Sequence, residues 1–235
     1  MSRRLRVVGV GRAGGALGLA LEGVGWTVEL ALGRGDDPAG AAHGVDLLVL
    51  AVPDPAISGV AAAVDPDPDT VVAHLAGALG LDVLAGHPRP AALHPLAALP
   101  DAETGAARLV DGAWFAVAGD RLVEQVVADL GGHAFTVADE DRTRYHAAAV
   151  IASNHLVALL GQVERVAPEG VPLVAFLALV RGTVDNVAAL GPAGALTGPV
   201  ARGDRATVEA HLAALPGAER PAYEAMAAEA RKLVG

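Results

Sequence analysis

The sequence is 235 residues long, which is enough for one large domain or for a medium domain with a small one. Its formal net charge of -10 argues against nucleic acid and anionic membrane surfaces as partners. The absence of cysteine excludes disulfides, thiolate nucleophiles and cysteine-bound metals. Hydrophobic residues make up 53% of the chain and aromatics only 3%, which favours helices packed on a parallel sheet.

The N-terminal stretch has basic residues before an apolar run, as a signal peptide would. Glycines and Arg12 interrupt that run, so a first β-strand is the better interpretation. No unbroken apolar stretch is long enough to span a bilayer. We therefore expect a cytoplasmic protein that binds neither nucleic acid nor membranes.

Short apolar runs alternate with helical and turn segments up to residue 138. They predict helices at 16–22 and 121–130 and strands at 5–10, 26–32, 46–52, 70–75, 91–93, 114–118 and 134–137. This alternation is typical of a parallel, doubly wound sheet with right-handed crossovers.

From residue 139 the pattern is helical. It predicts long helices at about 139–165 and 172–190, a loop at 191–199, and shorter helices at 204–215 and 221–233. The expected fold class is therefore α/β, with a doubly wound Rossmann domain over 1–138. An all-α domain over 139–235 is expected to bind substrate and to form a dimer.

The segment from Gly9 to Gly14 reads G-x-G-x-x-G, directly after an apolar strand and at the start of a helix. Gly9 permits a tight turn, Gly11 lets a pyrophosphate approach the backbone, and Gly14 lets the helix lie close to the strand. Chance is the alternative in a chain with 29 glycines, but the context favours dinucleotide binding. The expected contacts are Gly9, Gly11, Arg12, Ala13, Gly14 and, after the third strand, Val52 and Pro53.

The end of the second strand distinguishes NAD from NADP. An NAD-binding protein usually has an acidic residue there, about 20 residues beyond the glycines, whereas here the strand ends Leu32-Gly33-Arg34-Gly35. An arginine at this position can bond a 2′-phosphate through its forked donors. Glu29 is the rival for NAD, but it lies within the strand, so Arg34 favours NADP.

Candidate side chains for chemistry follow the predicted strands, where ligands bind in open α/β sheets. We expect His94 to contact substrate and His74 to orient its loop. On the helix that starts near 139, helical spacing places Arg142, His146, Val150 and the pair Ser153/Asn154 on one face. Such polar groups would need partners if buried, and a solvated face is the competing interpretation.

Polar residues also gather later in the chain. Thr183 and Asn186 form a pair on the second long helix, and Thr197 and Arg202 could bind a carboxylate. Asp204 could cap the following helix, with Thr207 in its first turn. The eight histidines show no metal-ligand spacing, so no metal is expected.

At these motifs the chain resembles a bacterial family of Rossmann-like proteins with a C-terminal domain long labelled as of unknown function. The resemblance covers the glycine motif, AVPDPAI (51–57), HLAGALGLDVL (74–84), LHPL (93–96), YHAAAVIASNHL (145–156) and LTGPVARGD (196–204). It implies a fold related to pyrroline-carboxylate reductases and 6-phosphogluconate dehydrogenases. Some members look like an alternative class of ketopantoate reductase.

Two features depart from the pattern that the resemblance implies. The family usually has Ser or Thr after the histidine at 74, where this chain has Leu75 and Ala76. The better-known ketopantoate reductases use a lysine as general acid, whereas Lys232 is the only lysine here. The proton would then come from His146, whose type of side chain titrates near neutrality, or from a held water. Asn154 and Asn186 are the other catalytic candidates.

The leading hypothesis is an NADPH-dependent reductase of a small anionic 2-oxo acid, with ketopantoate as the best single substrate. Substrate contacts are expected from His94, Ser153, Thr197 and Arg202. The alternatives are an imine reductase of the pyrroline-carboxylate type and a non-catalytic NADP(H)-binding sensor. The helices of 139–235 are more apolar than helices with one solvated side, which predicts a homodimer.

Overall fold

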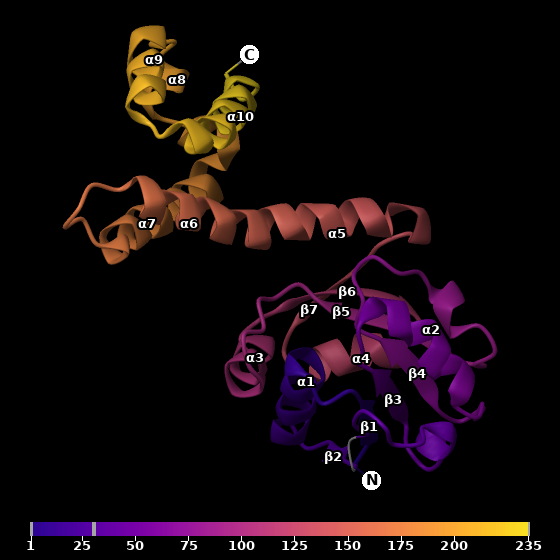
Figure 1. Cartoon of the computed structure of the whole chain (residues 1–235). Coiled ribbons are helices and arrows are strands. Elements are labelled where there is room, and N and C mark those ends of the chain that lie inside the picture. The colour runs from indigo at the N-terminus through magenta and orange to yellow at the C-terminus, as the bar shows by residue number, and fades with distance from the viewer. Residues whose placement is uncertain (1, 30–31, 235) are drawn as a thin grey trace. The chain divides into compact units, whose positions relative to one another are not determined.

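The computed structural model describes residues 2–29 and 32–234 (Figure 1). Their contacts divide the chain into two compact units, 1–153 and 154–235. The change from strands to helices falls near residue 139, as the sequence indicates. The contacts nevertheless assign the helical residues up to Ser153 to the first unit, because several of their side chains pack at the edge of the sheet.

The first unit contains a seven-stranded sheet in the order β2-β1-β3-β4-β5-β6-β7. Its strands are β1 (Arg4–Val8), β2 (Thr27–Val28), β3 (Leu47–Leu50), β4 (Val71–His74), β5 (Pro90–Pro95), β6 (Trp114–Gly119) and β7 (His133–Thr136). This confirms the predicted α/β class with a Rossmann domain. The last residues predicted for the second strand include 30–31, which lie outside the described residues.

The sheet is parallel except between β5 and β6, so the prediction of an entirely parallel sheet is wrong at that pair. Pro95 at the end of β5 pairs with Phe115 near the start of β6. The connection between them therefore returns to the edge at which β5 ends and needs no crossover.

The helices of the first unit are α1 (Arg12–Gly23), α2 (Asp54–Ala63), α3 (Ala102–Leu109), α4 (Leu122–Asp129) and α5 (Arg142–Val150). Short 3-10 helices lie at η1 (Ala39–Ala42), η2 (Leu81–Leu84) and η3 (Asp139–Asp141), and a π-helical turn lies at η4 (Ile151–His155). The sequence reading missed α2 and α3. Pro55 ends a strand but is also tolerated in the first turn of a helix, and Asp101 caps α3 by accepting a hydrogen bond from the Thr104 N–H at 2.7 Å.

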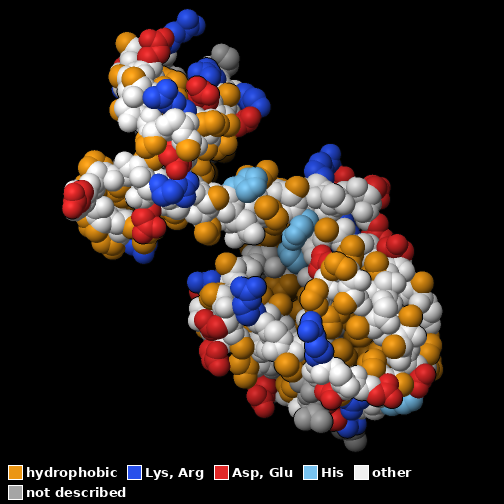
Figure 2. Space-filling view, viewed as in Figure 1, with side chains coloured by type: hydrophobic (Ala, Val, Ile, Leu, Met, Phe, Trp, Pro, Cys, Tyr) orange, Lys and Arg blue, Asp and Glu red, His pale blue; other side chains and the backbone are white. Residues whose placement is uncertain are grey.

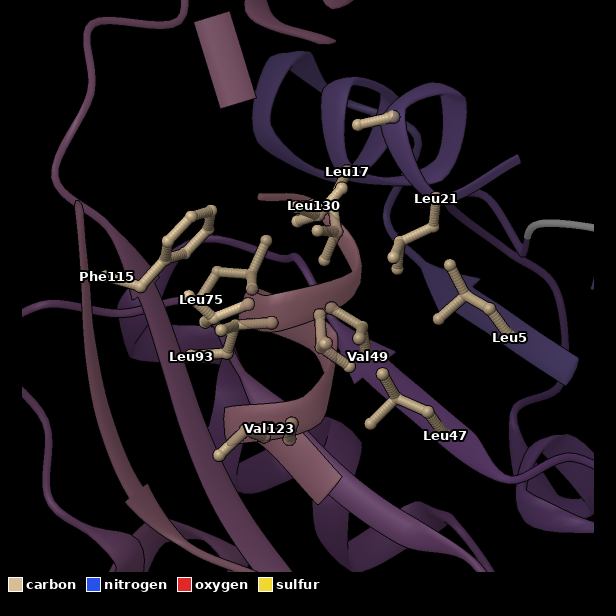
Figure 3. Packing of buried hydrophobic residues seen from close by; sticks show 14 of the residues in the cluster. Leu5, Leu17, Leu21, Leu47, Val49, Leu75, Leu93, Phe115, Val123 and Leu130 are labelled. Atoms are coloured by element: carbon tan, nitrogen blue, oxygen red, sulfur yellow. The ribbon is translucent and has the colours of Figure 1, made fainter. Parts of the chain in front are cut away.

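The two faces of the sheet carry separate apolar cores. On β3, Leu47 and Val49 pack with α1, α3 and α4, and Figure 3 shows this cluster. Leu48 and Leu50 point to the other face and pack with η1, α2 and η2. Because every residue of β3 is buried, its sequence is a continuous apolar run rather than an alternating one.

The second unit is helical, with α6 (Leu156–Val166), α7 (Leu173–Ala195), α8 (Gly198–Ala201), α9 (Arg205–Ala214), η5 (Gly217–Glu219) and α10 (Arg220–Arg231). The predicted loop at 191–199 is helical in part, and the chain kinks there because Gly191 has φ +71° and Pro192 follows. Asp204 caps α9 as predicted, accepting a hydrogen bond from the Thr207 N–H at 3.0 Å.

Two helical segments are long and apolar enough to cross a membrane by length and composition alone. They are Asp139–Val166, with 28 residues and hydropathy 1.3, and Leu173–Ala195, with 23 residues and hydropathy 1.6. Single charges such as Arg181 and Asp185 interrupt the apolar run of the second segment, but its mean hydropathy remains 1.6, so the expectation based on unbroken apolar stretches does not cover it. Core helices of water-soluble proteins meet the same criterion. Figure 2 shows hydrophobic side chains on the surface of these helices.

Candidate active site

The glycine motif forms the turn that the sequence predicts. Gly9 has φ +103°, and a Cβ atom there would lie 2.5 Å from the Ala51 carbonyl oxygen. A Cβ on Gly14 would overlap the Gly9 carbonyl oxygen, so this glycine permits the close approach of α1 to β1. Gly11 differs, because its Cβ would meet nothing within 4 Å. The space beside Gly11 is therefore open, as a ligand that approaches the backbone requires.

A cavity of about 750 Å³ lies beside this turn in the first unit. Its lining includes five predicted cofactor contacts, Gly9, Gly11, Arg34, Val52 and Pro53. The other three are placed elsewhere: Arg12 and Ala13 are the first residues of α1 and do not line the cavity, and Gly14 has the packing role described above. The cavity lies at the carboxyl ends of β1 and β3, where dinucleotides bind in this fold class.

The charged residues near the cavity bear on the choice between NAD and NADP. Glu29 pairs with Arg4 at 2.6 Å and with Arg6 at 3.2 Å, and the hydrogen bond from Arg4 lowers the pKa of its carboxyl group. Asp36 accepts a hydrogen bond from the Gly33 N–H at 2.7 Å. Arg34 is exposed and has no ion pair or hydrogen bond within residues 2–29 and 32–234. The cavity therefore presents a cation, while the rival carboxylate is engaged by two arginines.

A second group of side chains lies at the carboxyl ends of β4 and β5. His74 is the last residue of β4, fully buried, and pairs in register with Ala92 of β5, two residues before His94. Its Nδ1 accepts a hydrogen bond from the Ala76 N–H, and its Nε2 lies 3.2 Å from the Gly80 carbonyl oxygen. These two bonds fix a neutral imidazole with its proton on Nε2, and burial lowers its pKa. The expectation that His74 orients its loop is confirmed.

His94 is bonded to Tyr145, a residue that was not among the candidates selected from the sequence. The His94 Nδ1 lies 2.7 Å from the Tyr145 hydroxyl, and the two rings meet edge-on with centroids 5.5 Å apart. Burial, followed by the charges of His146 and Arg142, lowers the pKa of His94 to about 4. Burial raises the pKa of the tyrosine hydroxyl. Both side chains are therefore neutral at physiological pH.

His146, a candidate selected from the sequence, lies on α5 and belongs to the same cluster. Its ring lies edge-on to His94 with centroids 5.8 Å apart. A Cβ on Gly77 would lie 2.5 Å from His146 Nδ1 and 2.8 Å from His94 Nε2, so both imidazoles pack against a position that only glycine can occupy. The buried Nδ1 of His146 has no hydrogen-bond partner within the described part of the chain.

Arg142 is the largest fully buried side chain in the described residues, with 0% of its side chain exposed. Its Nε donates to Asp139 Oδ1 at 3.2 Å, and neither Nη atom has a partner among residues 2–29 and 32–234. An incompletely paired buried guanidinium is costly, and its charge acts on His74, His94 and Tyr145. On the predicted helix face Arg142 is thus buried and His146 is half-buried, so this part of the face is not solvated.

That face does not continue to Ser153 and Asn154, so the prediction that these two residues share a helix face with Arg142 and His146 is wrong. The chain forms a π-helical turn over Ile151–His155, which shifts the register of the following side chains. Both residues are exposed, and the division between the two units falls between them. The roles predicted for Ser153 in substrate binding and Asn154 in catalysis stay predictions.

The second unit brings three of its predicted polar residues together. Thr183 and Asn186 from α7 line a cavity of about 630 Å³ with Thr197, which precedes α8. Arg202 is exposed and does not line that cavity, so the structure does not bring it together with Thr197 there. Among the residues that the structure describes, no three His, Asp or Glu side chains are placed to hold a metal ion.

The sequence matches two domain families. Residues 36–100 match a Rossmann-like domain, and residues 114–230 match a domain of unknown function, DUF2520. The sequence matches no curated protein.

Several solved structures are similar to this one. A Bacteroides fragilis protein provisionally described as an NADP oxidoreductase has a TM-score of 0.79 at 19% identity, over 98% of each chain. A reductive aminase from Aspergillus terreus, solved with NADPH4, cyclohexanone and allyl amine, has a TM-score of 0.70 at 17% identity, over 98% of this chain and 95% of the other. A pyrroline carboxylate reductase from Plasmodium falciparum, solved with NADP bound, has a TM-score of 0.62 at 13% identity, over 99% and 98%. These similarities establish a shared fold.

Proposed function

Because the chain belongs to the Rossmann-like proteins that carry a DUF2520 domain, we propose that it is an NADP-dependent reductase of a small molecule. The observation that carries this proposal is the presence of two features on one sheet. A ligand-sized cavity lies at the carboxyl ends of β1 and β3, and the His94–Tyr145–His146 cluster lies at those of β4 and β5. The likeness to reductases solved with NADP or NADPH supports it.

The residues at the cavity fit a dinucleotide. The backbone at Gly11 and the N-terminus of α1 would hold the pyrophosphate, because the space beside Gly11 is open and no side chain among the described residues caps this helix. The Gly9 N–H is not available for this, since it donates to the Leu32 carbonyl oxygen at 2.8 Å. Arg34 would bond the 2′-phosphate, which NADP has and NAD lacks. When bound, NADPH supplies a hydride for an electrophilic carbon.

For the substrate we propose a small anionic 2-oxo acid, with the reduction of ketopantoate to pantoate as the first candidate. The family resemblance supports this choice. Among the sequence candidates for the proton, His146 lies in the cluster, and a water held by Asn154 or Asn186 is the alternative. Thr197 and Arg202 are the residues that the sequence suggests for the substrate carboxylate, and of these only Thr197 lines the cavity of the second unit.

Imine reduction is the second candidate. Its support is the likeness of the fold to a reductive aminase and to a pyrroline carboxylate reductase. A non-catalytic NADP(H) sensor is the third candidate, but it gives no reason to place three half-buried titratable rings in contact at the carboxyl edge.

A substrate panel separates the three candidates. NADPH absorbance should fall on addition of 2-oxo acids, ketopantoate among them, and stay constant with cyclic imines. Turnover of cyclic imines alone would favour the second candidate. Tight NADPH binding without turnover of either class would favour the sensor, and no binding of NADPH or NADP would contradict all three.

Arg34→Ala tests the cofactor preference. A charge-assisted contact is worth roughly 1.5–3 kcal/mol, so NADPH affinity should fall about ten- to a hundredfold while NADH affinity changes little. Arg121→Ala, which removes an exposed arginine at the start of α4, is the matched control. Equal losses for both cofactors would show that Arg34 does not contact the phosphate.

We propose further that the protein is a cytoplasmic homodimer joined through its C-terminal helices. Large apolar side chains on α7 are exposed in the single chain, including Val174 (65%), Leu179 (67%) and Leu190 (63%). A second copy would cover them, and two-fold pairing is the commonest arrangement. Light scattering should give twice the 23.5 kDa chain mass. A monomer with full activity, or recovery in the membrane fraction, would contradict this.

A further inference from the structure

We infer that the hydroxyl group of Tyr145 donates the proton in this reduction, and that His94 and the buried guanidinium of Arg142 position it. Tyr145 is then a catalytic residue, and His94 and Arg142 are positioning residues. The inference rests on the proposed reductase function but assigns the proton to a different group from the one the sequence suggested.

The hydroxyl of Tyr145 is held in a fixed place. Its ring meets Phe135 of β7 edge-on with centroids 5.7 Å apart and meets His94 of β5 on another side, at 5.5 Å. The hydroxyl, its one polar side-chain atom, lies 2.7 Å from His94 Nδ1. Contacts from α5, β5 and β7 therefore orient one hydroxyl group at the carboxyl edge of β5.

The histidines around it are less suited to give up a proton. His94 is a neutral imidazole, and both nitrogens of His74 are already bonded to its own loop. The buried Nδ1 of His146 has no hydrogen-bond partner within residues 2–29 and 32–234, so no hydrogen bond to this atom orients its ring as His94 orients Tyr145. The hydroxyl group of Tyr145 needs no added charge before it donates.

The guanidinium of Arg142 supplies what a tyrosine donor requires. It is fully buried with only its Nε bonded, to Asp139, so its charge is poorly screened. That charge lowers the pKa of the Tyr145 hydroxyl against the opposing effect of burial, and it also disfavours a second positive charge on His94. It therefore stabilises the tyrosinate that proton transfer leaves behind.

The other charged groups that act on this cluster come from several elements. They are the carboxylates of Asp54 on α2 and Asp139 on η3, and the titratable rings of His74 on β4 and His146 on α5. The two carboxylates act on His74 and raise its pKa, whereas the positive charge of Arg142 acts on both Tyr145 and His94 and lowers their pKa values. Arg142 is thus the variant position at which a change in charge should reach the tyrosine.

The proposed step conserves atoms and charge. His94 donates its Nδ1–H to the oxygen of Tyr145, which leaves the tyrosine hydrogen free to point at the substrate. The O–H bond of Tyr145 breaks and a new bond forms between that proton and the substrate oxygen, or nitrogen in an imine, while the substrate carbon accepts a hydride derived from NADPH. The tyrosinate keeps its bond from His94 and is reprotonated from water.

The sequence offers a direct test, because it contains only two tyrosines, Tyr145 and Tyr223. Tyr223 is likewise bonded to a histidine, His211, at 2.7 Å, but in the second unit and at the surface. In a Tyr223→Phe background the ultraviolet absorbance of tyrosinate reports on Tyr145 alone. Adding Arg142→Met should raise the pKa of Tyr145, and adding Arg142→Lys should restore it in large part. An unchanged titration with both variants would overturn the role of Arg142.

Activity tests the donor itself. Tyr145→Phe should lower kcat by roughly 10²- to 10⁴-fold with unchanged NADPH affinity, whereas Tyr223→Phe should have the activity of the unaltered protein. His146→Asn, which alters a ring packed against His94, should lower kcat by less than Tyr145→Phe does. Near-normal kcat in Tyr145→Phe, together with a large loss in His146→Asn, would overturn the inference. Failure of the unaltered protein to bind NADPH would instead overturn the proposed function, so the two failures are distinguishable.

Discussion

The two histidine–tyrosine pairs of this chain have almost the same geometry in very different surroundings. In the first unit the His94 and Tyr145 rings lie 5.5 Å apart at 87°, and in the second unit the His211 and Tyr223 rings lie 5.8 Å apart at 89°. Both pairs share a 2.7 Å hydrogen bond. Only the first is packed beside a second histidine and near a buried arginine. Burial and the neighbouring charge, rather than the bond itself, distinguish a candidate site from a surface contact.

The largest expected effect of this difference is on how the free energy of unfolding depends on pH. Burial lowers the pKa of His94 from 6.5 to about 4, so the folded chain favours the neutral ring. The resulting stabilisation is fully present above pH 6.5 and is lost as the pH falls from 6.5 toward about 4, by up to about 3 kcal/mol. His94→Asn keeps an amide near Nδ1 but cannot titrate. Urea unfolding at several pH values should show a shallower acid loss in this variant, and equal slopes would contradict the buried site.

The next largest effect is expected at Gly77, which has no counterpart in the surface pair. A Cβ there would lie 2.5 Å from His146 Nδ1 and 2.8 Å from His94 Nε2, so Gly77→Ala must displace both rings. A displacement of about 1 Å at a reacting group can cost roughly a hundredfold in rate, and we expect that loss in kcat with unchanged NADPH affinity. Gly23→Ala, where a Cβ meets nothing within 4 Å, is the control. A kcat within a few-fold of normal would show that the rings need not stay in place.

Much of the first unit follows from local patterns in the sequence. The apolar runs on β1, β3 and β4 and the glycine turn depend on neighbouring residues, so composition and spacing reveal them. The strand β6 was also predicted, at 114–118, but its direction was not, because its antiparallel pairing depends on where the connection from β5 returns. Helix α2 was hidden by Pro55, which ends a strand and begins a helix equally well.

The candidate site was predicted only in part, for a similar reason. His94 and His146 could be selected from the sequence because histidines next to strand ends and within an apolar helix are unusual. Tyr145 could not, because its role depends on a bond to a residue 51 positions earlier in the chain. The one signal in the sequence is that Tyr145 is directly adjacent to His146. Both side chains are half-buried on α5. The π-helical turn at Ile151–His155, which removed Ser153 and Asn154 from the predicted face, has no local signal that we recognise.

The smallest effect concerns the contribution of each hydrogen bond to stability. Tyr145→Phe leaves the partly buried His94 Nδ1 without its partner, and loss of such a bond typically costs about 1 kcal/mol. At the second pair water can replace the lost hydroxyl, because His211 is exposed, so Tyr223→Phe should cost less than about 0.5 kcal/mol. Urea unfolding of the two variants at pH 7 makes the comparison directly, since each removes one oxygen atom from the same kind of pair. If both variants lose the same free energy of unfolding, water would reach the two pairs equally well, in spite of their different burial. The electrostatic role of Arg142 would then be the remaining distinction between them.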